Sequence, residues 1–363
     1  MNDKYWIGFS SVESLDSAFV LRLYNYFGDI EKAFCADLSE LKNIDGLSVK
    51  KSSDFLKIRD SLDLDKIYND VINRGVKYFT FEDESYPQML KNIESPPAVL
   101  YYKGDISRCN FNKTVAVVGS RKASFNGKEA LKYLISGLGN TDICIVSGLA
   151  SGIDTCAHTS AIDNNLSTIG VIASGFDYVY PSSNKSLYEK IINECGLVMS
   201  EYYPTFEPLK FRFPQRNRIV TGLSYGTLVV EASLKSGALI SANLTLEQGR
   251  ELMCVPGLIT NPNTEGIYKL LKNGASLITK SEDILEALNW EILSEKPKQL
   301  NFCDMDEVET KIFKSLEVED KGLDMIATET GLDIDSLLSY LTIMELKGII
   351  KSVEGDRYKR ADR

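Results

Sequence analysis

Rings and cations alternate along one stretch of this sequence, from Glu201 to Arg218. Aromatic faces stack on unpaired bases and cations hold phosphates, so this mixture suits a groove for single-stranded nucleic acid. The alternative is a loop whose rings belong to the core and whose cations are solvated, because aromatic side chains pack more often than they bind. The stretch alone leaves both interpretations open. Its rings and cations are Tyr202, Tyr203, Phe206, Lys210, Phe211, Arg212, Phe213, Arg216 and Arg218.

Pro214 is expected to open a helix within this stretch. Proline is well tolerated at a first helical position, because the N–H group that it lacks would have no partner there. The remaining free N–H groups of a helix start attract phosphate. The pattern therefore predicts a helix N-terminus beside the rings and cations.

Three apolar, strand-like runs each end in a loop of small residues, at 119–124, 147–152 and 173–175. Glycine and serine in such loops let backbone N–H groups and helix ends approach an anion closely. One loop of this kind would be a weak signal. Because the carboxyl ends of parallel strands meet at one edge of a sheet, the three together predict an anion-binding site.

Arg121 stands in the first of these loops and argues against a dinucleotide cofactor. It occupies the position where the second glycine of G-x-G-x-x-G would bring the backbone close to a pyrophosphate. Its planar guanidinium group instead suits a single phosphate, held through two hydrogen bonds. We therefore expect a phosphate-sized site and no cofactor.

Asp154 and His158 are the titratable residues nearest to the second loop. Ser151 and Asp154 have the spacing of a capping box, and His158 lies one turn further along the same helix face. His158 is the single histidine of the chain, which removes most imidazole-based acid–base schemes. Structural support of the helix start is therefore favoured over catalysis for both residues, and no catalytic residue is predicted.

Glu231 ends an apolar, strand-like run. It is either a general base or a carboxylate that orients Arg216 and Arg218, and the ion pair is the safer interpretation because both cations lie close in sequence. Ser236 is expected to cap a helix that begins near Ala238.

The composition is that of a soluble globular protein, with 44% hydrophobic and 25% charged residues. No apolar run reaches the roughly 20 residues of a membrane span and no signal peptide opens the chain, so we expect a cytoplasmic protein. The net charge of −10 argues against coating of duplex DNA but leaves room for a local basic groove. Seven scattered cysteines without a C-x-x-C pair predict reduced thiols and no metal site.

The length of 363 residues predicts two or three domains. Residues 1–74 are expected to form a small helical domain, similar to SAM or helix-hairpin-helix modules or simply a helical packing domain. Residues 75–290 alternate apolar runs with amphipathic segments, which predicts a Rossmann-like, doubly wound, mostly parallel α/β sheet. Residues 291–303 form a polar linker, and residues 304–363 a winged-helix domain.

Particular segments carry these expectations. Helices are predicted at 14–27, ending before Gly28, and at 38–47 and 52–61. Strands are predicted at 78–81, within 96–104, and at 115–118, 143–146, 169–172, 197–199, 228–230 and 252–255. The third helix of the winged-helix pattern, with a hairpin turning at Glu354-Gly355 after it, contains the acidic residues Asp335 and Glu345. A protein-interaction or regulatory role is therefore favoured for that domain over a grip on a major groove.

Taken together, the motifs resemble the DNA-processing protein A (DprA/Smf) family over roughly residues 75–285. The motifs are Tyr86-Pro87, Pro96-Pro97 and Lys103-Gly104; Val118-Gly-Ser-Arg121; Ser147-Gly-Leu-Ala-Ser-Gly-Ile-Asp154 with Ala157-His158; Gly175, Tyr180-Pro181 and Asn184; Phe213-Pro-Gln-Arg-Asn-Arg-Ile219 with Gly222-Leu-Ser224; Val229-Val-Glu-Ala232; Ser236-Gly-Ala238; and Val255-Pro-Gly257.

The resemblance implies a protein that binds single-stranded DNA, forms a homodimer and helps to load the recombinase RecA during natural transformation, without catalysis. It also implies a strand-binding pocket with small-residue loops beside it. Together with the cations and small residues singled out above, the predicted DNA-binding residues are Gly119, Ser120, Arg121, Ser147, Gly148, Lys210, Phe213, Arg216, Asn217, Arg218, Ser236 and Gly237.

Two alternatives remain open. The first is an enzyme, a nucleotide hydrolase of the lysine-decarboxylase-like or phosphoribohydrolase type, because those folds also place a Gly-Thr segment and a glutamate at a strand end, as Gly226-Thr227 and Glu231 do here. The second is a regulatory scaffold that acts through the winged helix.

Overall fold

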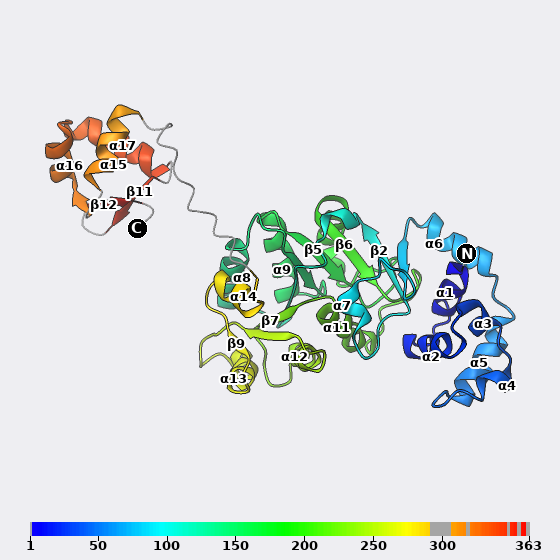
Figure 1. Cartoon of the computed structure of the whole chain (residues 1–363). Helices are drawn as coiled ribbons and strands as arrows, with labels where there is room; N and C mark the ends of the chain where they lie inside the picture. The colour runs from blue at the N-terminus through cyan, green and yellow to red at the C-terminus, as the bar shows by residue number, and fades with distance from the viewer. Residues whose placement is uncertain (1, 291–305, 317–319, 347–348, 354–356, 361–363) are drawn as a thin grey trace. The chain divides into compact units, whose positions relative to one another are not determined.

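The computed structural model describes residues 2–290, 306–316, 320–346, 349–353 and 357–360. The chain forms two compact units, Met1–Glu291 and Ile292–Arg363 (Figure 1). The predicted linker at 291–303 lies outside the described residues. The first unit contains both the N-terminal helices and the sheet, so a domain boundary after residue 74 stays a prediction.

A nine-stranded sheet forms the centre of the first unit, in the order β1-β2-β6-β5-β4-β3-β7-β8-β9. The strands β3 to β9 pair in parallel, while β1 and β2 add an antiparallel edge. The predicted doubly wound, mostly parallel sheet is therefore confirmed. The strands are β1 Lys77–Thr80, β2 Val99–Gly104, β3 Thr114–Gly119, β4 Cys144–Ser147, β5 Ser167–Val171, β6 Gly196–Ser200, β7 Gly226–Val230, β8 Glu251–Cys254 and β9 Ser276–Leu277.

Helices cover both faces of this sheet, as alternate residues of β3 show. Val115 and Val117 pack against α8 and α9, whereas Ala116 and Val118 pack on the opposite face against α11 and α12. Strands buried on both sides read as continuous apolar runs, which is why the sequence predicts them well. The helices are α7 Gln88–Lys91, α8 Phe125–Ser136, α9 Ile153–Asp163, α10 Lys185–Lys190, α11 Arg212–Gly222, α12 Gly237–Glu247, α13 Glu265–Lys272 and α14 Ser281–Ala287.

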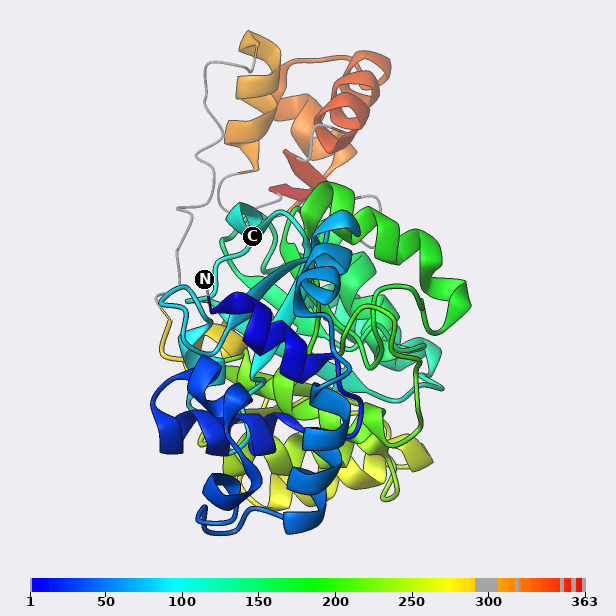
Figure 2. The same ribbon diagram turned by 90° about the vertical axis from the view of Figure 1, so that its right-hand side faces the viewer.

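Six helices precede the sheet and gather beside its β1–β2 edge (Figures 1 and 2). Their core, which includes Trp6 and Phe9, continues into Val99 and Tyr101 of β2. The predicted helix end before Gly28 is confirmed, because Gly28 caps α2 with a φ of 66°. The six are α1 Asp3–Ser10, α2 Ser17–Phe27, α3 Ile30–Cys35, α4 Leu38–Leu41, α5 Val49–Arg59 and α6 Leu64–Asn73.

The second unit is a small winged-helix domain. Its three helices enclose a core that includes Ile312, Leu337 and Leu341. A three-stranded antiparallel sheet in the order β10-β12-β11 completes it. The predicted turn at Glu354-Gly355 lies outside the described residues. The elements are α15 Glu307–Ser315, β10 Lys321–Gly322, α16 Leu323–Thr330, α17 Ile334–Leu346, β11 Ile350–Val353 and β12 Arg357–Arg360.

Across the described part of both units, no helix combines the length and apolar character needed to cross a membrane.

Arg212, the first residue of α11, ties this helix to the N-terminal helices. Its guanidinium group is 2% exposed and lies 4.7 Å from the ring centre of Tyr202 and 5.1 Å from that of Phe206. It donates a hydrogen bond to the carboxylate of Glu13, in the loop between α1 and α2. The Glu13–Arg212 ion pair therefore joins two parts of the first unit.

We expect Glu13→Gln to lower the free energy of unfolding, because it leaves a buried guanidinium group without its carboxylate. Removing one partner of a fully buried pair costs roughly 3–5 kcal/mol, and the 58% exposure of Glu13 reduces the expected loss to about 1–2 kcal/mol. Urea denaturation followed by circular dichroism measures it.

The matched control is Asp16→Asn, which removes a surface ion pair with Lys51 but keeps an oxygen to cap α2. Its effect should stay below about 0.5 kcal/mol. Equal losses in the two variants would show that the Glu13–Arg212 pair has no special weight.

Candidate nucleic-acid interface

A cavity of about 460 Å³ opens at the carboxyl ends of the central parallel strands. This is the edge of an α/β sheet where ligands bind. The strands β3 and β7 approach each other so closely here that position 119 requires a glycine. A Cβ atom at Gly119 would lie only 2.0 Å from the carbonyl oxygen of Val230. Seven predicted DNA-binding residues line this cavity: Gly119, Ser120, Arg121, Arg216, Asn217, Ser236 and Gly237.

One wall of the cavity is the N-terminus of α12. The hydroxyl oxygen of Ser236 accepts a hydrogen bond from the N–H of Ala238 at 3.2 Å, so the predicted cap is confirmed. Gly237, the first residue of the helix, is exposed and carries no side chain that would cover the neighbouring N–H groups. Because Ala238 and Leu239 both donate their N–H groups to Ser236, the helix start offers an anion the N–H of Gly237 and the positive end of the helix dipole.

Arg121, which lines this cavity, contacts Phe213 just outside it, although the two residues are far apart in sequence. The guanidinium carbon of Arg121 is 5.4 Å from the ring centre of Phe213, within cation–π range. The exposed ring of Tyr180 meets Phe213 edge-on at 5.3 Å. Sequence reasoning left Tyr180 out of the site, although the Tyr180-Pro181 motif was a signal for it.

Arg216 reaches the same cavity from inside the protein. Its side chain is 3% exposed and its Nη1 donates to the carbonyl oxygen of Val171 at 2.8 Å. Burial lowers its pKa, and the negative charge of Asp154 opposes that shift. Its Nε has no hydrogen-bond partner among the described residues. Gly148 provides the space for this side chain, because a Cβ atom there would lie 1.8 Å from Nη1.

Asp154 also lines the cavity, but the capping box predicted with Ser151 is wrong. The helix α9 begins at Ile153, and its N-cap is Gly152, whose φ of 84° favours glycine. The Asp154 carboxylate instead accepts a hydrogen bond from the N–H of Ala150 at 3.3 Å. Burial raises its pKa, and the positive charge of Arg216 opposes that effect.

His158 is fully buried and does not brace the start of α9, contrary to the prediction. Its Nδ1 lies 2.7 Å from the hydroxyl oxygen of Thr168 on β5. Because that hydroxyl donates to the carbonyl oxygen of Ile145, Nδ1 must carry the hydrogen. Burial lowers the pKa of His158 to about 3, so the imidazole is neutral at physiological pH. His158 thus joins α9 to the sheet.

Glu231 forms no ion pair with Arg216 or Arg218, so that prediction is wrong. Its carboxylate accepts hydrogen bonds from the backbone N–H of Ser124 at 2.8 Å, from the Ser124 hydroxyl and from the amide of Asn261 at 3.0 Å. It lines a separate cavity of about 240 Å³. Glu231 therefore anchors the loop between β3 and α8, which carries Arg121.

The remaining predicted residues lie outside the cavity. Ser147 is buried and its hydroxyl donates to the carbonyl oxygen of Val117. Lys210 is exposed in the turn just before α11. Arg218 forms a two-bond ion pair with Glu201, at 2.9 and 2.6 Å.

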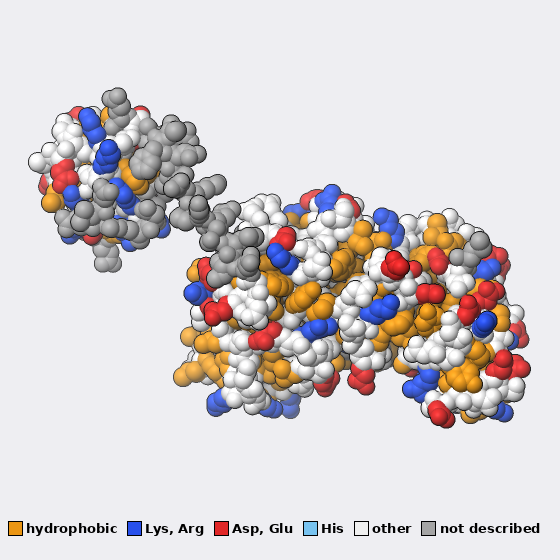
Figure 3. All heavy atoms as spheres, viewed as in Figure 1, with side chains coloured by type: hydrophobic (Ala, Val, Ile, Leu, Met, Phe, Trp, Pro, Cys, Tyr) orange, Lys and Arg blue, Asp and Glu red, His pale blue; other side chains and the backbone are white. Residues whose placement is uncertain are grey.

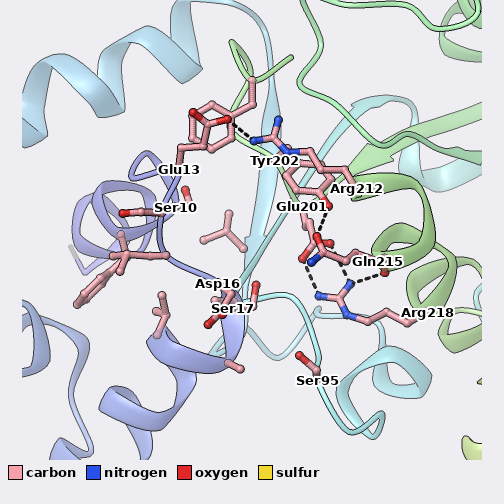
Figure 4. A pocket seen from close by; sticks show the side chains of 18 of the residues that line it. Ser10, Glu13, Asp16, Ser17, Ser95, Glu201, Tyr202, Arg212, Gln215 and Arg218 are labelled. Carbon is pink, nitrogen blue, oxygen red and sulfur yellow. Dashed lines mark hydrogen bonds and ion pairs between the residues drawn. The ribbon is translucent and has the colours of Figure 1, made fainter. Parts of the chain in front are cut away.

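The helix α11 divides the aromatic–basic stretch between two cavities. It begins at Arg212, so Pro214 is its third residue, and the prediction that Pro214 opens the helix is wrong. At about 3.6 residues per turn, neighbouring positions face different ways. Arg212, Gln215 and Arg218 line a second cavity of about 450 Å³ beside α1 and α2, shown in Figure 4. Phe213 and the cavity-lining residues Arg216 and Asn217 lie on the side of the candidate site.

Two family models match this chain, one over the region that contains the candidate site and one over the C-terminal part. The family described as DNA recombination-mediator protein A matches residues 77–289, and a DprA winged helix domain matches residues 297–356. The chain belongs to this family. The DNA-processing family resemblance read from the motifs is thus confirmed.

Full-length and partial relatives support the family assignment. Protein Smf of Escherichia coli is 31% identical over 371 residues, which cover 99% of this chain and 97% of that protein. The DNA processing protein DprA of Streptococcus pneumoniae is 45% identical over 207 residues, which cover 57% of this chain and 72% of that protein.

A solved family structure, that of DprA from Streptococcus pneumoniae, matches with a TM-score of 0.69 and 36% identity over 78% of this chain and 95% of that one. DNA processing protein A from Helicobacter pylori matches with a TM-score of 0.53 and 30% identity, over 59% of this chain and 98% of that one. That second structure is described as giving insight into the single-stranded DNA binding mode of the Helicobacter protein.

We expect Gly148→Ala to lower the free energy of unfolding by about 1–3 kcal/mol, because the added methyl group overpacks the buried guanidinium group of Arg216. Urea denaturation measures the loss. Gly237→Ala is the control: a Cβ atom there meets nothing within 4 Å, so stability should be unchanged or slightly higher. Wild-type stability of Gly148→Ala would contradict the close packing of Arg216 on Gly148.

Proposed function

We propose that this protein binds single-stranded DNA at the cavity lined by Arg121, Arg216 and the N-terminus of α12. The observation that carries the proposal is the contact of Arg121 with the ring of Phe213 beside that cavity. It brings a stacking face and a phosphate-binding cation to one place. The second guanidinium group, on Arg216, and the N–H of Gly237 at the start of α12 add further anion contacts.

The rest of the molecule favours a local site. The net charge is −10, and acidic and basic side chains are interspersed on the face drawn in Figure 3. A broad basic field that would hold any duplex is therefore missing from that face. Each base stacked on an aromatic ring contributes about 1–3 kcal/mol, so two such contacts with paired phosphates suffice for micromolar affinity.

The relatives point the same way. The Helicobacter protein is described by its single-stranded DNA binding mode, and the family by recombination mediation. We infer that this chain protects single strands during DNA uptake and transformation and transfers them to a RecA-type recombinase, acting as a homodimer. The winged-helix domain then has a regulatory or protein-binding role. We further propose that the chain divides into domains at residues 1–74, 75–290 and 304–363, with a linker at 291–303.

Binding without catalysis is the better interpretation of the site. The alternative, a nucleotide hydrolase, needs Glu231 as a general base at the strand end. The carboxylate of Glu231 instead accepts three hydrogen bonds, from Ser124 and Asn261, beside a different cavity. The imidazole of His158 is fully buried and hydrogen-bonded to Thr168, so it is not available as a catalytic base.

We expect Arg121→Ala to weaken binding of labelled single strand and to flatten its dependence on salt, because it removes a cation that lines the cavity. Lys210 lies outside the cavity, in the turn before α11, and Lys210→Ala should have the same effect if the strand continues along this turn. Phe213→Ala should weaken binding by about 1–3 kcal/mol with little change in that salt dependence, because it removes a stacking face. A mobility shift with unlabelled duplex as competitor measures all three.

Lys132→Ala is the matched control, since Lys132 is an exposed cation of α8 that pairs with Glu129 and does not line the cavity. It should bind as the wild type does. Circular dichroism must accompany each variant to confirm folding. Unchanged affinity in all three site variants would place the strand elsewhere on the protein.

A further inference from the structure

The cavity of the proposed DNA site contains a carboxylate as well as cations. Asp154 lines it together with Arg121 and Arg216, and its side chain is only 8% exposed. The hydrogen bond that it accepts from Ala150 is long, at 3.3 Å. A phosphate that enters this cavity would therefore lie near a buried carboxyl group as well as near the two guanidinium groups.

Two cations act on Asp154 and a third lines the same cavity. Arg216 comes from α11, while Arg121 and Lys122 come from the loop after β3. Burial raises the pKa of Asp154, and Arg216, the backbone N–H groups of Ala150 and Gly148, and Arg121 oppose that shift only in part. A bound phosphate would oppose the cations, because a nearby negative charge disfavours a second one. Binding of an anion thus shifts Asp154 towards its protonated form.

We propose that Asp154 takes up a proton when single-stranded DNA binds, so that strand affinity is coupled to the protonation of this one carboxyl group. The proposal rests on the proposed function of the cavity and adds a pH dependence to it. Coupling is reciprocal: if the strand favours the protonated carboxyl, a lower pH favours the strand by the same factor. One linked proton limits the effect to about tenfold in affinity for each pH unit.

The chain offers little else that would titrate in the same range. Histidine is the side chain that ordinarily changes charge between about pH 5 and 8. This sequence has one histidine, His158, which lies on the same helix as Asp154. Burial lowers the pKa of His158 to about 3, so its charge stays at zero through that range. A gain in affinity on acidification therefore points to a carboxyl group.

The first test is the affinity for labelled single strand at about pH 5.5, 6.5 and 7.5 and constant ionic strength. Wild-type affinity should rise as the pH falls, by up to about tenfold for each unit. Asp154→Asn keeps an oxygen to accept the Ala150 N–H, so it should bind with an affinity that is independent of pH and no weaker than that of the wild type at the highest pH.

Glu251→Gln is the matched control. Its carboxylate accepts a hydrogen bond from Ser276 at the amino end of β8, the edge of the sheet opposite to the cavity. This variant should keep the full wild-type pH dependence. If Glu251→Gln lost the pH dependence, or if Asp154→Asn kept it, the assignment of the proton to Asp154 would be overturned.

The second test needs no variant. Calorimetric titration of the whole wild-type chain with single strand, in two buffers of different ionisation enthalpy, counts the protons taken up. We expect uptake of a fraction of one proton near pH 6.5. Binding with no uptake and a flat pH profile would overturn the proton coupling and leave the DNA site standing. No binding at any pH would sink the proposed function itself.

Discussion

A buried guanidinium group, that of Arg216, is the constraint on which the candidate site depends. Among the described residues, no carboxylate lies within ion-pair distance of it, and its hydrogen bond goes to a backbone carbonyl oxygen. Such a charge is stable inside a protein only when its surroundings compensate for the lost hydration. Asp154 compensates in part, through its charge. An anion bound in the cavity would compensate further.

Several neighbouring features follow from this one group. Gly148 has to lack a side chain, because Arg216 occupies the space where a Cβ would be. Arg121 extends the same positive region to the surface beside Phe213. The two faces of α11 have different roles. One face presents Arg216 to the cavity, while the other ties the helix to the N-terminal helices through Arg212 and Glu13.

The fold was largely predictable from the sequence because its determinants are local. Strands buried on both faces are continuous apolar runs, and Gly28 and Ser236 signal a helix end and a helix start. The helices α1, α3 and α6 were missed. The helix α3 has only six residues, whereas α6 has the apolar spacing of an amphipathic helix and an N-cap at Asp63, so its signal was present in the sequence. The winged helix was visible in its three helices and hairpin.

The site was predictable only in part, since its contacts join distant segments. The partner of Arg212 is Glu13, and the ring against Phe213 is Tyr180. No spacing rule relates such pairs. The stretch from Glu201 to Arg218 was expected to act as one surface, but the helix starts two residues before Pro214 and turns Arg218 to the other side.

Photo-cross-linking tests the central claim most directly, namely that unpaired polynucleotide lies against the rings and cations at the carboxyl edge of the sheet. Ultraviolet irradiation of the intact protein with a bromouracil-containing single strand, followed by peptide mass spectrometry, locates the bases. The account predicts adducts on the peptides that contain Tyr180 and Phe213. Adducts confined to the N-terminal helices or to the winged-helix domain would contradict it.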